Sequence, residues 1–213
     1  MLKISAKLQE LLEADEEAYL ACQRGILNLS AYARIIKKDL EQATKKSINL
    51  KSIIVGLSRL KRGLKPLKIE NNLAKWNLNI SLHSNLAELT YEKTAGNLKI
   101  LRDYYKHINL GRETYLAATQ GLNEITIIGD QDALAALRKN FQSSRLVYAK
   151  ENLTGITVKF PKEFINMPNM LYALYKRLAI KKINIIEIIS TFTEITFIVE
   201  KKDALAAIGQ LEL

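Results

Sequence analysis

The order of the segments in the last two thirds of the chain is the feature that most constrains its fold. Stretches in which apolar and polar residues alternate predict strands, and stretches with apolar residues three or four apart predict helices. Two consecutive blocks of about 60 residues each have the order strand, helix, strand, strand, helix, which constitutes an internal repeat. The expected strands are 77–82, 86–91, 114–119, 124–128, 144–149, 155–160, 183–189 and 194–199, and the expected helices are 97–107, 131–141, 168–178 and 203–211.

Each expected helix in these blocks is amphipathic and needs a sheet face to cover. A helix returning over a small antiparallel sheet gives the split βαβ, ferredoxin-like arrangement. Polar residues His83-Ser84-Asn85 separate the first two strands and predict a hairpin turn there. Hydrophobic residues make up 48% of the chain, which is ordinary for a soluble globular protein. This part is therefore predicted to be α+β.

The first third has only helical periodicity. Ser30 is the expected N-cap of a helix whose inner face carries Tyr32, Ile35, Ile36 and Leu40. After the polar break Thr44-Lys45-Lys46-Ser47, Asn49 is the expected N-cap of a second helix, which ends at Gly63. The inner face of this second helix is expected to carry Ile53, Ile54, Leu57 and Leu60. Helix, short turn and helix within about 35 residues is the length of a helix-turn-helix unit.

The positive charge of the chain is concentrated in this helical pair. Residues 34–68 hold eleven basic and two acidic residues, a net +9 out of the formal +10 of the whole chain. Such a concentration predicts an anion-binding surface, and bases at the start of the second helix could meet phosphates and base edges. The candidate nucleic-acid contacts are Lys45, Lys46, Lys51, Ser52, Arg59, Lys61 and Arg62.

Two interpretations of this basic surface remain open. A run of lysines also occurs on helix faces that are merely solvated, and the segment 65–73 with Pro66 leads away without a wing hairpin. The first interpretation is a DNA-binding head. The alternative is a head that docks onto an acidic protein partner and binds no nucleic acid.

Other functional classes have little support in the sequence. Cys22 is the only cysteine and lies in a helical pattern, so no internal disulfide forms and a buried, inert thiol is expected. His83 and His107 have no partner motif, and the consecutive acids at 15–17 fan around a helix instead of converging on a metal. No apolar run is long enough for a membrane span, and residues 1–17 turn acidic where a signal peptide would stay apolar. We therefore expect a cytoplasmic location. We expect no enzyme activity, no metal and no cofactor.

The last 60 residues resemble an ACT domain, most of all the regulatory ACT modules of aspartokinases. The resemblance lies in FPKEFINMPNMLYALYKRLAIKKINIIEIIST followed by TEITFIVEKKDALAAIGQL. Lys182-Ile183-Asn184-Ile185 is similar to the Gly-Ile-Asn-Ile entry into the second strand of that family, and Pro168 ends the loop before the helix. The first block is similar in order, with TQGLNEITIIGD its clearest segment.

This resemblance implies a ligand site at the loop and helix start, where backbone N–H groups would favour the carboxylate of an amino acid. Asn166 is the expected N-cap of that helix, and Asn184 could bind the amino end of the ligand. The implied ligand-binding residues are Asn166, Met167, Pro168, Asn169, Met170, Asn184 and Ile185.

The chain departs from the family pattern in three respects. Asn169 stands where ACT modules usually have glycine. The second block ends without an obvious final strand while the first has one strand too many, which a strand shared between the blocks would resolve. The segment before Ile69 offers no phosphate loop or nucleotide fold, so no kinase portion is present in it.

The sequence therefore predicts three domains: a helix-turn-helix-like helical domain at 1–68 and two ACT-like βαββαβ modules at 69–151 and 152–213. The expected function is ligand-sensing regulation, with an amino-acid effector, DNA as a possible partner and a homodimer paired through exposed sheet edges. The alternative is a non-catalytic interaction subunit that docks on a protein.

Overall fold

A computed structural model describes residues 4–64, 78–108, 115–141, 144–167 and 169–212. The chain divides into two compact units, Met1–Ile69 and Glu70–Leu213. The expected passage at 65–73 lies outside the described residues. None of the described helices is long and apolar enough to cross a membrane.

The first unit consists of helices, with an N-capping side chain at the start of three of them. They are α1 (Ile4–Ala14), α2 (Glu16–Gln23), α3 (Leu29–Thr44) and α4 (Leu50–Gly63). Asp15 caps α2 and Asn49 caps α4, the latter by accepting a hydrogen bond from the backbone N–H of Lys51 at 2.9 Å. The prediction of Ser30 as the cap of α3 is wrong. The N-cap of α3 is Asn28, whose side chain accepts a hydrogen bond from the backbone N–H of Ala31 at 3.0 Å.

One small apolar core holds the helices of this unit together. Ile53 and Leu57 are fully buried as predicted, and Ile54 and Leu60 pack against the same core. Ile35, expected on the inner face of α3, is 72% exposed, since the inner stripe of α3 runs through Tyr32, Ala33, Ile36 and Leu40. Cys22 is buried as expected, and burial raises the pKa of its thiol.

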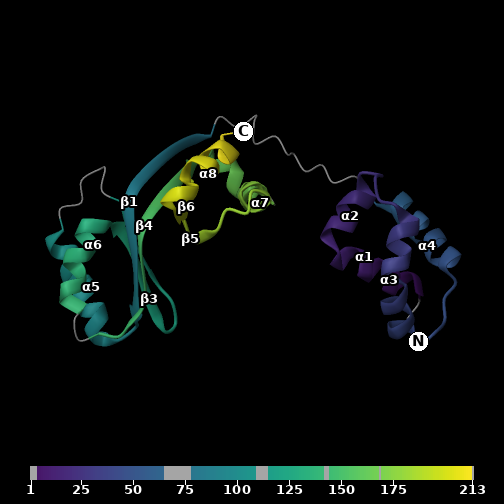
Figure 1. Cartoon of the computed structure of the whole chain (residues 1–213), viewed down its shortest axis with the longest axis horizontal. Helices are drawn as coiled ribbons and strands as arrows, with labels where there is room; N and C mark the ends of the chain where they lie inside the picture. The colour runs from purple at the N-terminus through teal and green to yellow at the C-terminus, as the bar shows by residue number, and fades with distance from the viewer. Residues whose placement is uncertain (1–3, 65–77, 109–114, 142–143, 168, 213) are drawn as a thin grey trace. The chain divides into compact units, whose positions relative to one another are not determined.

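The second unit contains one antiparallel sheet of six described strands in the order β2-β3-β1-β4-β6-β5 (Figure 1). Helices follow its strands in both halves. In chain order the elements are β1 (Asn79–Glu92), α5 (Ala95–His107), β2 (Leu116–Gln120), β3 (Glu124–Asp130), α6 (Gln131–Arg138), η2 (Lys139–Phe141), β4 (Leu146–Lys159), η3 (Lys162–Asn166), α7 (Met170–Ile180), β5 (Ile185–Ser190), β6 (Glu194–Glu200), η4 (Lys201–Asp203) and α8 (Ala204–Leu211).

The predicted hairpin at His83-Ser84-Asn85 is wrong, because β1 continues through these residues as one strand of 14 residues. A β-bulge between His83 and Leu86 contains the polar residues Ser84 and Asn85, and Asn85 has φ 60°. The strands predicted at 144–149 and 155–160 are likewise one strand, β4, in which Asn152 has φ 58°. The two long strands pair with each other along most of their length. The predicted module boundary at 151/152 falls inside β4.

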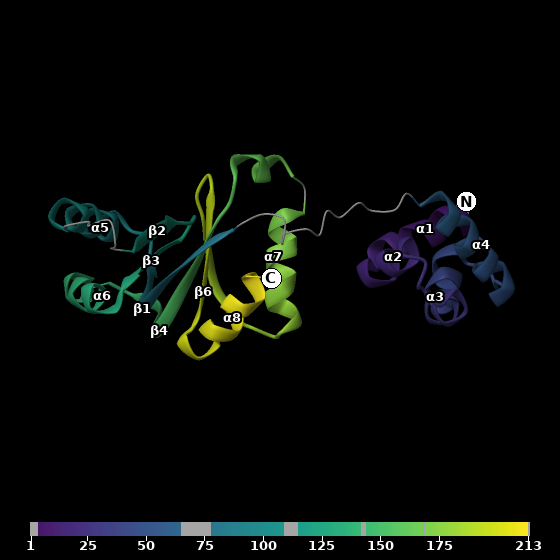
Figure 2. The same cartoon turned by 90° about the horizontal axis from the view of Figure 1, so that it is seen from above.

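The sheet is curled. In each half one face packs against helices, and the other faces, called helix-free here, meet each other. In the first half, Leu89, Tyr91 and Ile127 pack against α5 and α6. In the second half, Ile156, Val158 and Phe197 pack against α7 and α8. A third cluster consists of Leu86 and Ile128 from the first half and Leu153 and Ile198 from the second. It lies on the faces of the strands that point away from the helices, and it joins the two halves there. Figure 2 shows the resulting arrangement, in which α5 and α6 lie on one side of the strands and α7 and α8 on the other.

The two halves repeat the same local geometry. The hydroxyl oxygens of Thr90 and Thr126 lie 2.9 Å apart in the first half, and those of Thr157 and Thr196 lie 2.7 Å apart in the second. The turn residues Gly121 and Thr191 each donate their N–H to the carbonyl oxygen three residues later at 2.9 Å. These matches place the repeated sequence segments in corresponding positions of the sheet.

Candidate ligand pocket

A pocket of about 420 Å³ lies at the start of α7. Three segments form it: the end of β4 with the following η3, the first residues of α7, and the turn between β5 and β6. Its size is within the range of small-molecule sites. The lining residues are Phe160, Phe164, Ile165, Met167, Asn169, Met170, Leu171, Ser190, Thr191 and Phe192.

The N-cap residue of α7 provides no side-chain acceptor for the helix. Asn169 is the N-cap residue, but it adopts a left-handed conformation with φ 69°, and its side chain makes no capping hydrogen bond. The first N–H groups of a helix have no partner within the helix. A carboxylate at this point would accept from them and interact favourably with the positive end of the helix dipole.

The rest of the pocket is apolar and aromatic. The rings of Phe160 and Phe164 are stacked with centroids 4.3 Å apart, and both residues are buried. Phe192 at the tip of the turn is 66% exposed and forms the outer wall. None of the lining residues that the structure describes is charged. The pocket therefore combines the start of a helix, whose N-cap side chain makes no capping hydrogen bond, with a surface suited to an apolar side chain.

The structure brings some of the predicted site residues together and separates others. Met167, Asn169 and Met170 line the pocket. Asn166 does not cap α7: it is the last residue of η3, and α7 begins at Met170. Asn184 is exposed before β5, while Ile185 packs on the core of the second half. Pro168 lies outside the described residues.

Several pocket residues were not predicted from the sequence. Phe160 and Phe164 belong to the segment that resembles the family, but their stacking depends on η3, a short helix without a periodic signal. The turn at 190–192 contributes through the tertiary fold alone. The sequence analysis assigned it no role, because it lies between the expected strands 183–189 and 194–199.

The predicted nucleic-acid contacts all lie on the turn between α3 and α4 or on α4. Lys45 is the left-handed C-cap of α3, and Lys51 and Ser52 lie exposed in the first turn of α4. Arg59 and Arg62 are exposed further along this helix. Lys46 is also exposed. Lys61 is half-buried, and its Nζ donates to the carbonyl oxygen of Gly25 at 3.2 Å, so this side chain is held against the unit.

Comparisons with known proteins find likeness in structure alone. The sequence matches no family model and no curated protein. The regulatory subunit of aspartate kinase from Thermus thermophilus, in its ligand-free form, matches with a TM-score of 0.50 and 14% identity over 62% of this chain and 93% of that one. A structure of aspartokinase alpha and beta subunits matches with a TM-score of 0.51 and 12% identity, over 62% and 94% of the two chains.

The part of the chain that these structures match has an ACT-like fold. The likeness extends to the aspartate kinase of Clostridium acetobutylicum, with a TM-score of 0.52 and 12% identity over 63% of this chain. That match spans only 34% of the Clostridium enzyme. At such low identities the comparisons establish the ACT-like fold, in agreement with the family resemblance of the sequence, and the function has to be argued from the residues of this chain.

Proposed function

We propose that this chain is a non-catalytic regulatory protein that senses an amino acid through a pair of interlocked ACT-type modules. The pairing of β1 with β4 supports the two-module arrangement. Residues 86–92 of β1 extend the first half, whereas residues 79–83 of the same strand lie beside residues 155–159 of β4 and complete the second half. This exchange supplies the final strand that the second block lacks in sequence order.

The pocket at the start of α7 is the observation that carries the sensing role. An α-carboxylate would accept hydrogen bonds from backbone N–H groups at the start of α7, where the Asn169 side chain makes no capping bond, and the side chain of the ligand would lie against the Phe160–Phe164 pair. Because none of the described residues that line this pocket is charged, an amino acid with an apolar or aromatic side chain fits its chemistry best.

A thermal-shift screen of the full chain against the standard amino acids tests this role. A ligand that binds only the folded protein raises the melting temperature. We expect apolar amino acids to give the largest rise and Phe192→Ala to weaken their binding about tenfold, because part of the pocket wall is removed. Isothermal titration gives the affinities.

The matched control is Leu122→Ala. Leu122 is at the tip of the corresponding turn in the first half, is 94% exposed and does not line the α7 pocket. It should leave binding unchanged. Equal weakening by both variants, or no response to any amino acid, would contradict the proposed ligand site.

We infer that the helical unit transmits the signal by binding DNA. Exposed bases on the α3–α4 turn and on α4 support this, as does the presence of Lys51 and Ser52 in the first turn of α4. In a homodimer paired through edge strands β2 and β5, ligand binding would alter the spacing of two such heads. The proposal is thus a transcriptional regulator controlled by an amino acid.

DNA binding by the full chain is measured by fluorescence anisotropy with a labelled duplex, at about 50 to 200 mM salt. The double variant Arg59→Ala/Arg62→Ala should weaken binding about fivefold and make it less salt-dependent, because two phosphate contacts are lost. Lys181→Ala/Lys201→Ala removes the same charge from exposed positions of the sheet unit and should have little effect.

The second candidate is an interaction subunit whose basic head docks on an acidic protein. The same exposed bases favour it, because they attract acidic protein surfaces as well as phosphates. Absence of DNA binding at low salt, together with retention of amino-acid binding, would favour this candidate and exclude the DNA-binding head.

A further inference from the structure

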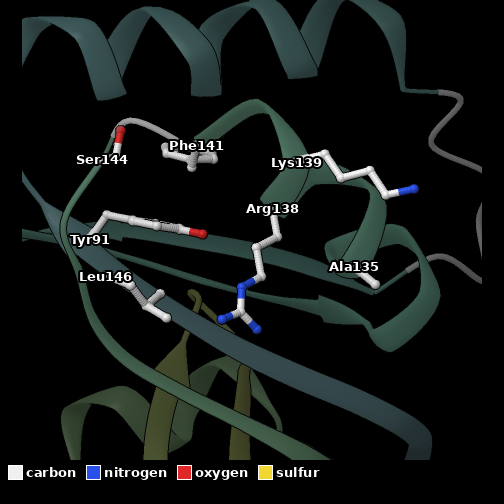
Figure 3. Close-up of a pocket in the computed structure, with 7 residues that line it drawn as sticks. All are labelled: Tyr91, Ala135, Arg138, Lys139, Phe141, Ser144 and Leu146. Carbon is white, nitrogen blue, oxygen red and sulfur yellow. The ribbon is translucent and has the colours of Figure 1, made fainter.

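A second pocket, of about 410 Å³, lies in the first half of the sheet unit and shares no residue with the α7 pocket. The end of β1, the last turn of α6 with η2, and the start of β4 enclose it (Figure 3). The lining residues are Tyr91, Ala135, Arg138, Lys139, Phe141, Ser144 and Leu146.

The charge of this pocket is positive and uncompensated. Arg138 and Lys139 line it, and none of the described lining residues is acidic. Within the described part of the chain, neither side chain forms an ion pair. Glu92, directly after Tyr91, pairs with Arg145 at 2.9 Å instead. An anion entering the pocket would therefore displace no carboxylate of the described residues from Arg138 or Lys139.

The two cations do not contribute equally. In Figure 3 the Arg138 side chain extends past the hydroxyl end of Tyr91 towards Leu146, whereas the Lys139 side chain extends away from Tyr91 and Phe141. The directed cation is thus one guanidinium, whose planar pair of N–H donors matches a carboxylate. Burial raises the pKa of Tyr91, and the opposing effect of Arg138 is smaller, so the hydroxyl stays protonated and can donate.

The walls of the pocket are held in place by contacts that involve no ligand. The ring of Tyr91 stacks on Phe141 with centroids 4.2 Å apart and an angle of 11° between the rings. The Ser144 hydroxyl donates to the side-chain oxygen of Asn97, whose amide in turn donates to the carbonyl oxygen of Glu92 at 2.7 Å. Fixed walls reduce the entropy lost on binding.

We propose that this pocket binds a small organic carboxylate with an apolar body, with Arg138 as its counter-ion. The carboxylate lies between the guanidinium and the Tyr91 hydroxyl, and the apolar body contacts Phe141, Leu146 and Ala135. A phosphate fits less well, because its larger charge calls for more donors than one directed guanidinium supplies. This site is independent of the α7 pocket and of the proposed sensing of amino acids.

Titration of the isotope-labelled full chain with phenylacetate, followed by NMR, tests the assignment. Saturable shifts of the Ala135 and Ser144 amides are expected, and Arg138→Gln should weaken binding about tenfold. Tyr91→Phe removes the hydroxyl but keeps the stacked ring, so it should weaken binding by a smaller factor. Inorganic phosphate should bind more weakly than phenylacetate.

The matched control is Arg102→Gln, which removes the same charge from an exposed position on α5. It should leave phenylacetate binding unchanged. Because Arg138 is in the last turn of α6 and also interacts with the helix dipole, the melting temperature of each variant is measured as well. No saturable binding, equal loss in Arg102→Gln and Arg138→Gln, or tighter binding of phosphate would each overturn the proposal.

Discussion

Phe197→Ala is expected to lower the free energy of unfolding of the sheet unit by about 3 to 5 kcal/mol, the usual cost of removing a buried phenylalanine. Phe197 is 1% exposed, and its side chain packs in the core between β6 and helices α7 and α8. Removing the ring leaves a cavity that the surrounding strands cannot close. Urea denaturation gives the change in free energy.

The effect of this substitution should extend to both halves of the sheet unit. β1 and β4 run through both halves, and Leu86 and Leu153 join their helix-free faces, so the halves should unfold together. Hydrogen exchange should show the same loss of protection at Leu89 in β1 as at Ile198 in β6. Leu205→Ala, at an 84% exposed position of α8, should change stability by less than about 0.5 kcal/mol. Loss of protection confined to the second half would contradict a single cooperative unit.

Glu88→Gln is expected to stabilise the protein by about 1 to 3 kcal/mol at slightly alkaline pH. Glu88 is 5% exposed on the helix-free face of β1, and its Oε2 has no hydrogen-bond partner among the described residues. Burial raises the pKa of its carboxyl and Glu187 raises it further, while the Thr90 hydroxyl and Lys150 lower it less. Lys150 contacts Glu200 at 2.6 Å, so its charge is largely engaged there.

The stabilisation should depend on pH in a defined direction. With a folded pKa above the unfolded value of about 4.3, the folded protein binds the proton more tightly. Stability of the native protein therefore rises as the pH falls through the folded pKa, and the advantage of Glu88→Gln disappears below the unfolded pKa. Thermal unfolding from about pH 8 to pH 4 measures this. Glu124→Gln, an exposed carboxylate on β3, serves as the control, and an equal advantage at all pH values would exclude titration of Glu88 as the cause.

Prediction of the elements succeeded where the pattern was local. Asn49 as an N-cap, the buried stripe through Ile53 and Leu57, and the helices of the sheet unit follow from side-chain periodicity and capping chemistry alone. The strand at 194–199 was found because its alternation is regular. Asn28 was missed as a cap because Ser30 offers the same chemistry two residues later, and only backbone geometry separates them.

Prediction of the long strands failed at two asparagines. Asn85 and Asn152 are residues that favour positive φ, which is typical of turns as well as of bulges. A turn or a bulge forms at such an asparagine depending on whether a neighbouring strand continues the pairing beyond it. In this sheet β1 and β4 pair with each other on both sides of these residues. That pairing joins residues far apart in sequence, so local patterns carry no information on it.

By itself the sequence determined the helical first unit, its basic surface, the repeated order of strand and helix and the ACT-like type of the second unit, because each depends on spacing and composition within a short segment. Only the tertiary structure decided that β1 and β4 pair with each other through both halves of the sheet, that Glu88 is buried, and that the turn at 190–192 closes the α7 pocket. These features depend on which distant faces meet, and that is set by the packing of the whole sheet.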